Sequence, residues 1–254
     1  MPLALITGAS GGIGLELAKV FARDGFDLVL VARTGGALER IADEIQVQFG
    51  RKAQVIAEDL SAPEAIERIV AAVPKVDVLV NNAGFGHLGF FHEIDAAKQI
   101  NSIDLNVTAL TALTRLYLPA MVARGSGRIL NVASTAAFQA GPLMTVYYAT
   151  KAYVLAFTEG IAEELNGTGV TATALCPGPV ITGFQARAGL IGTKLTSSPM
   201  VMTAVEVAEY GYRATMAGKV IAIPGFGNKL VAWSTRFAPR VLTRKIARSL
   251  QERK

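Results

Sequence analysis

A tyrosine and a lysine one helical turn apart are the residues of this sequence best suited to proton transfer. Tyr147 and Lys151 are four residues apart, so they share one face of a helix. A phenol with a pKa near 10 is a slow acid–base catalyst at neutral pH, but a neighbouring ammonium lowers that pKa. Ser134, thirteen residues upstream, offers a hydroxyl to a substrate carbonyl and to the alkoxide that develops from it. Alone the pair is an ordinary helix surface contact; with Ser134 it indicates carbonyl–alcohol chemistry.

A glycine-rich turn at residues 7–14, TGASGGIG, joins an apolar run to a segment of helical periodicity. Residues without a Cβ allow a tight turn, close approach to a pyrophosphate and close helix–strand packing, and the helix N-terminus adds N–H donors. The alternative is a merely flexible turn, but its place between strand and helix favours a nucleotide site. The residues expected to contact the cofactor here are Gly8, Ser10, Gly11, Gly12, Ile13 and Gly14.

The same turn also matches the G-x-S-x-G elbow of hydrolases around Ser10. That motif requires an acid and then a histidine later in the chain. The only histidines are His87 and His92, and the last 162 residues contain none. A hydrolase is therefore the poorer interpretation, and two histidines five residues apart make no metal site.

The end of the second apolar run indicates which nucleotide binds. An NAD site usually has an acid there to accept the ribose 2′-hydroxyl, whereas this chain has Ala32 followed by Arg33. A guanidinium pairs with a 2′-phosphate, and no carboxylate repels it. The sequence predicts NADP(H), with a solvated surface arginine as the alternative.

Seven apolar runs of strand length alternate with segments of helical periodicity. The runs are apolar throughout, as in parallel sheets that helices cover on both faces. This order predicts an α/β fold, a single-domain Rossmann-type doubly wound parallel sheet of about seven strands. The expected strands are 3–7, 27–32, 53–57, 77–80, 128–133, 170–176 and 219–223.

Helical spacing predicts the remaining elements. Residues 183–202 are the longest stretch without one, and a loop of that length beside a site is often a lid. We therefore expect a catalytic domain at 1–227, with a lid-like loop at about 183–202, and a basic amphipathic extension at 228–254. The expected helices are 13–21, 38–49, 63–72, 97–118 (ending near Pro119), 146–166 and 203–217.

Taken together, these motifs make the chain resemble the short-chain dehydrogenase/reductase family, in its NADP-preferring form, over nearly all its length. The resemblance implies an enzyme in which Tyr147 is the general acid/base, and Lys151 lowers its pKa and holds the nicotinamide ribose. It also implies that Ser134 orients the carbonyl and Asn106 holds a water in a proton relay. The motifs are Thr7-Gly8-x-x-x-Gly12-x-Gly14, Asp59-Leu60, Asn81-Asn82-Ala83-Gly84, Asn106, Ser134, Tyr147-x-x-x-Lys151 and Pro177-Gly178.

Further cofactor contacts are implied by the resemblance alone. Asp59 would contact the adenine, Asn81 the adenosine ribose region and Thr182 the nicotinamide amide, while Ser10 and Arg33 match the NADP-preferring pattern. The family also implies a homodimer or homotetramer formed through the helices at 97–118 and 146–166. Other expected cofactor-binding residues are Leu60, Ala83, Gly84, Pro177 and Gly178.

Composition limits the class of protein. With 51% hydrophobic and 18% charged residues, a 254-residue chain is long enough for one large folded domain and is not disordered. A single cysteine, Cys176, allows no intramolecular disulfide and suits a reducing compartment. Charges interrupt every apolar run before transmembrane length, and the N-terminal residues lack a signal peptide's basic region. We expect a cytoplasmic protein, with peripheral membrane contact left open.

The positive charge is concentrated at the end of the chain. Residues 229–254 hold eight basic residues and one acid, a net charge of +7, whereas the rest holds 17 basic and 19 acidic residues, or −2. The high pI therefore gives no reason to expect nucleic-acid binding by the body. Leu242, Ile246 and Leu250 form an apolar stripe with arginines roughly opposite. This helix either packs on the body or a second subunit, or lies on an anionic membrane.

Apolar residues in segments near the expected crevice favour a lipophilic ketone, acyl or steroid-like substrate, although core packing explains some of them equally well. The sequence leaves open the substrate, the direction and the stereochemistry. It also leaves as alternatives a catalytically silent NADP(H)-binding regulator and a membrane-associated scaffold. The apolar residues are Phe85, Leu88, Phe90, Phe91, Phe138, Leu143, Met144, Phe184, Leu190 and Ile191.

Overall fold

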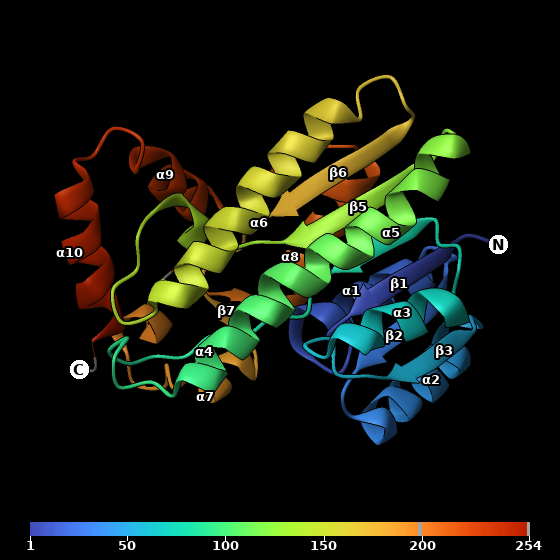
Figure 1. Ribbon diagram of the computed structural model, residues 1–254, viewed down its shortest axis with the longest axis horizontal. Helices are drawn as coiled ribbons and strands as arrows, with labels where there is room; N and C mark the ends of the chain where they lie inside the picture. The colour runs from blue at the N-terminus through green and yellow to red at the C-terminus, as the bar shows by residue number, and fades with distance from the viewer. Residues whose placement is uncertain (198–199, 253–254) are drawn as a thin grey trace.

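The apolar runs of the sequence form one parallel sheet in the computed structural model, which describes residues 1–197 and 200–252. The order is β3-β2-β1-β4-β5-β6-β9, with every neighbouring pair parallel, so the expected fold class is confirmed (Figure 1). The strands are β1 (Leu3–Thr7), β2 (Asp27–Ala32), β3 (Ala53–Ala57), β4 (Val78–Asn81), β5 (Gly127–Val132), β6 (Val170–Leu175) and β9 (Ile221–Ala222).

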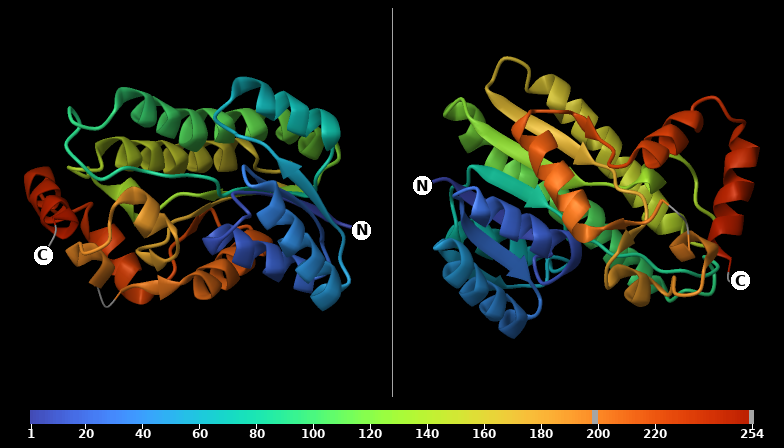
Figure 2. Two further views of the ribbon diagram at one scale, coloured as in Figure 1. Left: turned by 90° about the horizontal axis from the view of Figure 1, so that it is seen from below. Right: turned by 180° about the vertical axis from the view of Figure 1, so that it is seen from behind.

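Helices cover both faces of the sheet, which is why the strands are apolar on both sides (Figure 2). One face carries α1 (Gly12–Arg23), α2 (Gly35–Phe49) and α8 (Ala204–Met216). The other carries α3 (Pro63–Ala72), α5 (Leu110–Ala123) and α6 (Thr145–Glu164).

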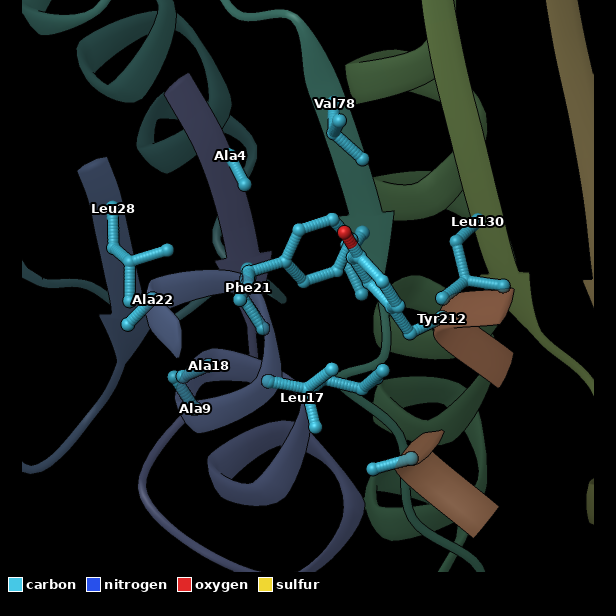
Figure 3. Close-up of a cluster of buried hydrophobic side chains, with 14 of the residues drawn as sticks. Ala4, Ala9, Leu17, Ala18, Phe21, Ala22, Leu28, Val78, Leu130 and Tyr212 are labelled. Atoms are coloured by element: carbon cyan, nitrogen blue, oxygen red, sulfur yellow. The ribbon is translucent and has the colours of Figure 1, made fainter. Parts of the chain in front are cut away.

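Phe21 anchors the first of these two cores. Its ring packs edge-on against Phe26, with 5.1 Å between centroids, and against Tyr212 of α8 at 4.9 Å. Leu28 and Leu130 extend the cluster across the sheet (Figure 3). Edge-to-face aromatic pairs add to the burial energy, so this contact holds α8 and α1 together under the glycine turn.

The strand order reverses at β1, which has β2 on one side and β4 on the other. In doubly wound sheets the connections leave in opposite directions at such a point and open a crevice beyond the carboxyl ends of the strands. The glycine-rich turn follows β1, and the segment after β4 faces it. The fold therefore places the predicted nucleotide turn where ligands bind.

One long helical stretch departs from expectation. It consists of α4 (Ala96–Ile103), a π-helical segment η1 (Asp104–Ala109) and α5, and it continues past Pro119 to Ala123. The predicted end near Pro119 is wrong because Met121, fully buried against the sheet, stabilises the last turn.

The same helical stretch, residues 96–123, is long and apolar enough to cross a membrane, contrary to the expectation from the sequence. The core helices of soluble proteins meet the same criterion of length and composition. Here α5 packs on the sheet.

The segment expected to be a lid carries short elements. β7 (Val180–Ile181) pairs with β8 (Met202–Thr203), and α7 (Phe184–Ala188) and η3 (Lys194–Ser197) lie between them. Residues 198 and 199 lie outside the described part of the chain. The remaining elements are η2 (Thr135–Phe138), α9 (Phe226–Ser234) and α10 (Arg240–Gln251), of which the two helices stand beyond the carboxyl edge of the sheet (Figure 1).

Candidate active site

The glycine turn is held tightly between β1 and β4. Gly8 and Gly12 have φ of +67° and +60°, which L side chains rarely adopt. A Cβ on Gly14 would lie 2.4 Å from the Gly8 carbonyl oxygen, so only glycine fits. The Thr7 hydroxyl accepts hydrogen bonds from the backbone N–H groups of Asn82 and Ala83, at 2.9 and 3.0 Å. This packing leaves the bare backbone of the turn facing the crevice, as a pyrophosphate requires.

A cavity of about 760 Å³ begins at this turn and extends along the carboxyl edge of the sheet. Most of the residues expected to contact cofactor or substrate line it, whereas Gly14, Asn81 and Asn106 do not. The expected residues in its wall are Gly8, Ser10, Gly11, Gly12, Ile13, Arg33, Asp59, Leu60, Ala83, Gly84, Ser134, Tyr147, Lys151, Pro177, Gly178 and Thr182.

Asn81 faces the interior and not the cavity. Its amide nitrogen donates to Asn131 Oδ1 at 2.9 Å and to Thr114 Oγ1 at 3.1 Å, and Asn131 donates in turn to Thr158. Asn82 lines the cavity in its place, and its amide donates to the Thr7 carbonyl at 2.8 Å. Neighbouring residues of a strand point to opposite sides, and the partners on β5 and α5 hold Asn81 on the inner side.

The part of the cavity wall around Arg33 carries charged side chains of both signs. Arg33 is exposed and lines the cavity beside Asp59. Burial raises the pKa of the Asp59 carboxyl, but hydrogen bonds from Ser61 and the positive charge of Arg33 together hold it below its ordinary value. The other acid there, Glu58, is held by Arg68 through two contacts of 2.7 Å. Arg33 is thus available to an anionic group in the cavity.

Ser134, Tyr147 and Lys151 come together further along the same cavity. Ser134 follows β5, and its hydroxyl accepts from the Ala136 N–H at 3.1 Å and hydrogen-bonds the Tyr147 phenol. Lys151 lies one turn along α6 from Tyr147, with its Nζ 5.7 Å from the centre of that ring. The ammonium also donates to the Val132 carbonyl at 2.7 Å, which fixes its position.

Burial is the main influence on the pKa values of Tyr147 and Lys151. It raises the pKa of Tyr147 well above the ordinary value, against a lowering by the hydrogen bond with Ser134. Burial also lowers the pKa of Lys151 to about 8. Desolvation thus outweighs the hydrogen bond with Ser134, and the pKa of the Tyr147 phenol lies above the lowered value expected from the sequence. A protonated phenol at neutral pH is suited to donate its proton.

Asn106 lies behind the cavity in the π-helical segment η1 and is almost fully buried. Its amide donates to Phe85 O at 2.9 Å and to Thr150 Oγ1 at 3.0 Å, and its oxygen accepts from Phe85 N–H at 3.1 Å. Asn106 thereby ties the loop after β4 to α6, beside Lys151. A single π turn inside a helix often marks a functional position, and no sequence signal predicts it. Its part in a proton relay stays a prediction.

Gly86 is a site residue that sequence reasoning missed. A Cβ there would lie 2.8 Å from the ring of Tyr147, so this loop presses directly on the phenol. Phe184 of α7 packs on the other side, 5.4 Å between ring centroids. The sequence signal for Gly86 is a second glycine two residues after Gly84, which is typical of a close approach by the backbone.

Part of the cavity wall is apolar and combines distant parts of the chain. Of the ten apolar residues expected near the substrate, four line it, whereas Phe90, Phe91 and Ile191 are exposed and Phe138 packs against a core cluster. Val231 of α9 and Leu250 of α10 also line it, so the C-terminal segment contributes to the site. The four are Phe85, Met144, Phe184 and Leu190.

A glycine turn at the switch point of a doubly wound sheet, with a serine, tyrosine and lysine in the same cavity, is a Rossmann-type arrangement with a candidate nucleotide site beside a candidate proton-transfer group. The chain belongs to the short-chain dehydrogenase family, whose model matches residues 2–189. It is 32% identical to very-long-chain 3-oxoacyl-CoA reductase of Rattus norvegicus over 90% of this chain and 75% of that one.

Two solved structures share the fold over almost the whole chain. A short-chain dehydrogenase from Sphingobium yanoikuyae in complex with NADPH has a TM-score of 0.85 and 32% identity, covering 93% of this chain and 94% of that one. A 7beta-hydroxysteroid dehydrogenase has a TM-score of 0.88 and 25% identity, covering 97% and 96%. The first curated relatives are longer, and the chain spans 60–63% of their length.

Proposed function

We propose that the protein is an NADP(H)-dependent oxidoreductase that interconverts a carbonyl and a secondary alcohol on a lipophilic substrate. One observation carries this proposal: Ser134, Tyr147 and Lys151 line the same cavity as the glycine turn. A proton donor and a nucleotide site must face one carbon for hydride transfer, and this cavity brings them together.

Ser134, Tyr147 and Lys151 each have a different role in the proposed reaction. The nucleotide, when bound, supplies or accepts the hydride. In reduction the Ser134 hydroxyl donates a hydrogen bond to the substrate oxygen, and the Tyr147 phenol gives that oxygen its proton. The raised pKa of Tyr147 keeps this proton in place at neutral pH. Lys151, still mostly protonated at pH 7 with a pKa of about 8, stabilises the phenolate left behind.

The preference for NADP(H) over NAD(H) is supported by the wall of the cavity. No acid follows β2, and Ser10 and Arg33 both line the cavity, where they would be available to a 2′-phosphate. The two nearby acids are occupied, Glu58 by Arg68 and Asp59 by Ser61. The related Sphingobium yanoikuyae structure contains NADPH.

A lipophilic substrate is supported by the apolar part of the cavity wall and by the substrates named for two similar proteins. Phe184, Leu190, Val231 and Leu250 contribute apolar surface there. One relative is a very-long-chain 3-oxoacyl-CoA reductase, and one structural neighbour is a hydroxysteroid dehydrogenase. A ketone, an acyl thioester or a steroid-like alcohol fits such a wall better than a sugar does.

The decisive experiment follows oxidation of NADPH and of NADH, in parallel, with bulky ketones, 3-oxoacyl thioesters, keto-steroids and small sugars. We expect turnover with NADPH and the lipophilic carbonyls, and turnover lower by about 10²–10⁴-fold with Tyr147→Phe. Preference for sugars would refute the lipophilic substrate. NADPH binding without turnover on any class would instead support the catalytically silent regulator.

We also propose a cytoplasmic homo-oligomer. The stretch α4–α5 and the neighbouring α6 leave large apolar side chains exposed, among them Ile100, Leu116 and Tyr153. Tyr153 joins the two helices, since its hydroxyl is 3.0 Å from that of Thr111. Light scattering after gel filtration tests this, and a monomer at micromolar concentration would contradict it.

A further inference from the structure

The last two helices expose an unusual amount of apolar surface. Large apolar side chains of α9, of α10 and of the segment between them are at least one-third exposed, and Phe226 and Phe237 reach 84% and 71%. Trp233 and Phe237 contact each other at 4.8 Å between ring centroids. Contiguous exposed apolar surface on a soluble domain usually marks an interaction site. The set, here called the C-terminal apolar surface, is Phe226, Leu230, Val231, Trp233, Phe237, Val241, Leu242, Ile246 and Leu250.

The orientation of α10 leaves its apolar stripe outside. The helix packs on the body through Thr243, Ala247 and Gln251, all buried. Leu242 and Ile246 are each 50% exposed. Within the stripe only Leu250 also lines the cavity of the body, whereas Leu242 and Ile246 stay half-exposed.

The segment that carries this surface is strongly basic. Its described part, residues 229–252, holds six basic residues and one acid, a net charge of +5. The one acid in the segment, Glu252, is 3.3 Å from Arg248. The Arg248 guanidinium also lies 5.8 Å from the Phe90 ring, which brings the exposed Phe90–Phe91 loop beside α10. A helix with an apolar stripe on one side and arginines roughly opposite matches the surface of a bilayer with anionic headgroups.

The surface begins at the mouth of the cavity. Val231 and Leu250 line the cavity and are also 42% and 37% exposed. From Leu250, Ile246 and Leu242 continue at four-residue spacing along α10 away from the cavity. A lipophilic molecule leaving lipid could therefore reach the cavity along apolar side chains.

We propose that α9 and α10 dock the enzyme on an anionic lipid membrane and that its substrate enters the cavity from that side. The route of entry rests on the proposed function, whereas the docking does not. A second copy of this chain is the poorer occupant, because a two-fold contact would bring two segments of net charge +5 together.

Flotation with phosphatidylcholine vesicles, with and without phosphatidylglycerol, tests the docking. We expect the full chain to float only with the anionic vesicles and to be released by high salt. Arg244→Glu/Lys245→Glu should weaken binding roughly 30-fold or more, since each basic residue near such a surface contributes about fivefold. Trp233→Ser/Leu242→Ser/Ile246→Ser should also lose binding. The matched controls are Arg40→Glu and Val47→Ser on exposed positions of α2, which should float normally.

Three outcomes would overturn the proposal. They are equal flotation with neutral and anionic vesicles, unchanged flotation of both C-terminal variants, and conversion of an oligomer to a monomer by the triple serine variant. The last would mean that a second copy covers the surface. Circular dichroism confirms that each variant is folded. Flotation does not require turnover, so its failure leaves the reductase proposal standing, and an inactive protein that floats would refute only the reductase.

Discussion

Replacing Lys151 by methionine should stabilise the protein at neutral pH. Burial lowers the pKa of this ammonium from 10.5 to about 8. Each pKa unit is worth about 1.4 kcal/mol, so the charged side chain destabilises the fold by about 3 kcal/mol below pH 8. Methionine removes this penalty but leaves the Val132 carbonyl, now bonded at 2.7 Å, without its donor, which costs about 1–2 kcal/mol. The net gain is about 1–2 kcal/mol, or roughly 2–8 °C in Tm for a chain of this size.

The pH dependence identifies the cause. Below pH 8 the lysine is charged in both states, and the penalty is complete. Between pH 8 and 10.5 the unfolded state binds more protons than the folded state, so wild-type stability rises with pH relative to the variant. Above 10.5 the penalty is gone, and the wild type should be the more stable protein because its amine still bonds Val132.

Urea unfolding at pH 7 and pH 10, without nucleotide, measures both values. Lys75→Met, at an exposed lysine, is the matched control and should change little at either pH. A Lys151→Met protein that is less stable than wild type at pH 7, or whose difference from wild type does not vary with pH, would refute the reasoning. Loss of turnover in the same variant is expected and is independent of this test.

Three further substitutions separate the parts of the site. Tyr147→Phe should lower turnover by about 10²–10⁴-fold while NADPH binding, followed by fluorescence, stays near normal; substantial turnover would contradict its role. Arg33→Ala should weaken NADPH binding by roughly 10–100-fold and leave NADH binding unchanged in calorimetry; equal effects on both would mean that Arg33 does not meet the 2′-phosphate. Gly86→Ala should lower kcat roughly 10–100-fold, because its Cβ would lie 2.8 Å from the Tyr147 ring and would displace that ring. Gly36→Ala has open space around its Cβ and should leave kcat unchanged.

Local patterns explain why so much of the fold could be predicted. The strand runs bury both faces, and helical stripes such as that of Phe21 follow the 3.6-residue period, so each element is recognisable within its own segment. Tyr147 and Lys151 are likewise neighbours on one helix. The glycine turn is defined by backbone conformations that its own residues must adopt, as at Gly8 and Gly12.

The errors arose where distant segments decide the outcome. Asn81 turns inward because Asn131 and Thr114, on other elements, offer it partners. The helix continues past Pro119 because the sheet buries Met121, which no local propensity reveals. The phenol of Tyr147 is less acidic than expected because its burial depends on Gly86, in the loop after β4, and on Phe184 of α7, which lie far from it in the sequence.

The wall that α9 and α10 give to the cavity separates two parts of the site along the chain. The glycine turn lies at residues 7–14, whereas Val231 and Leu250 come more than two hundred residues later. The family model ends at residue 189, before either helix. Substitutions confined to α9 and α10 can therefore reshape the apolar wall while the glycine turn stays unchanged, so the two parts of the site can diverge separately.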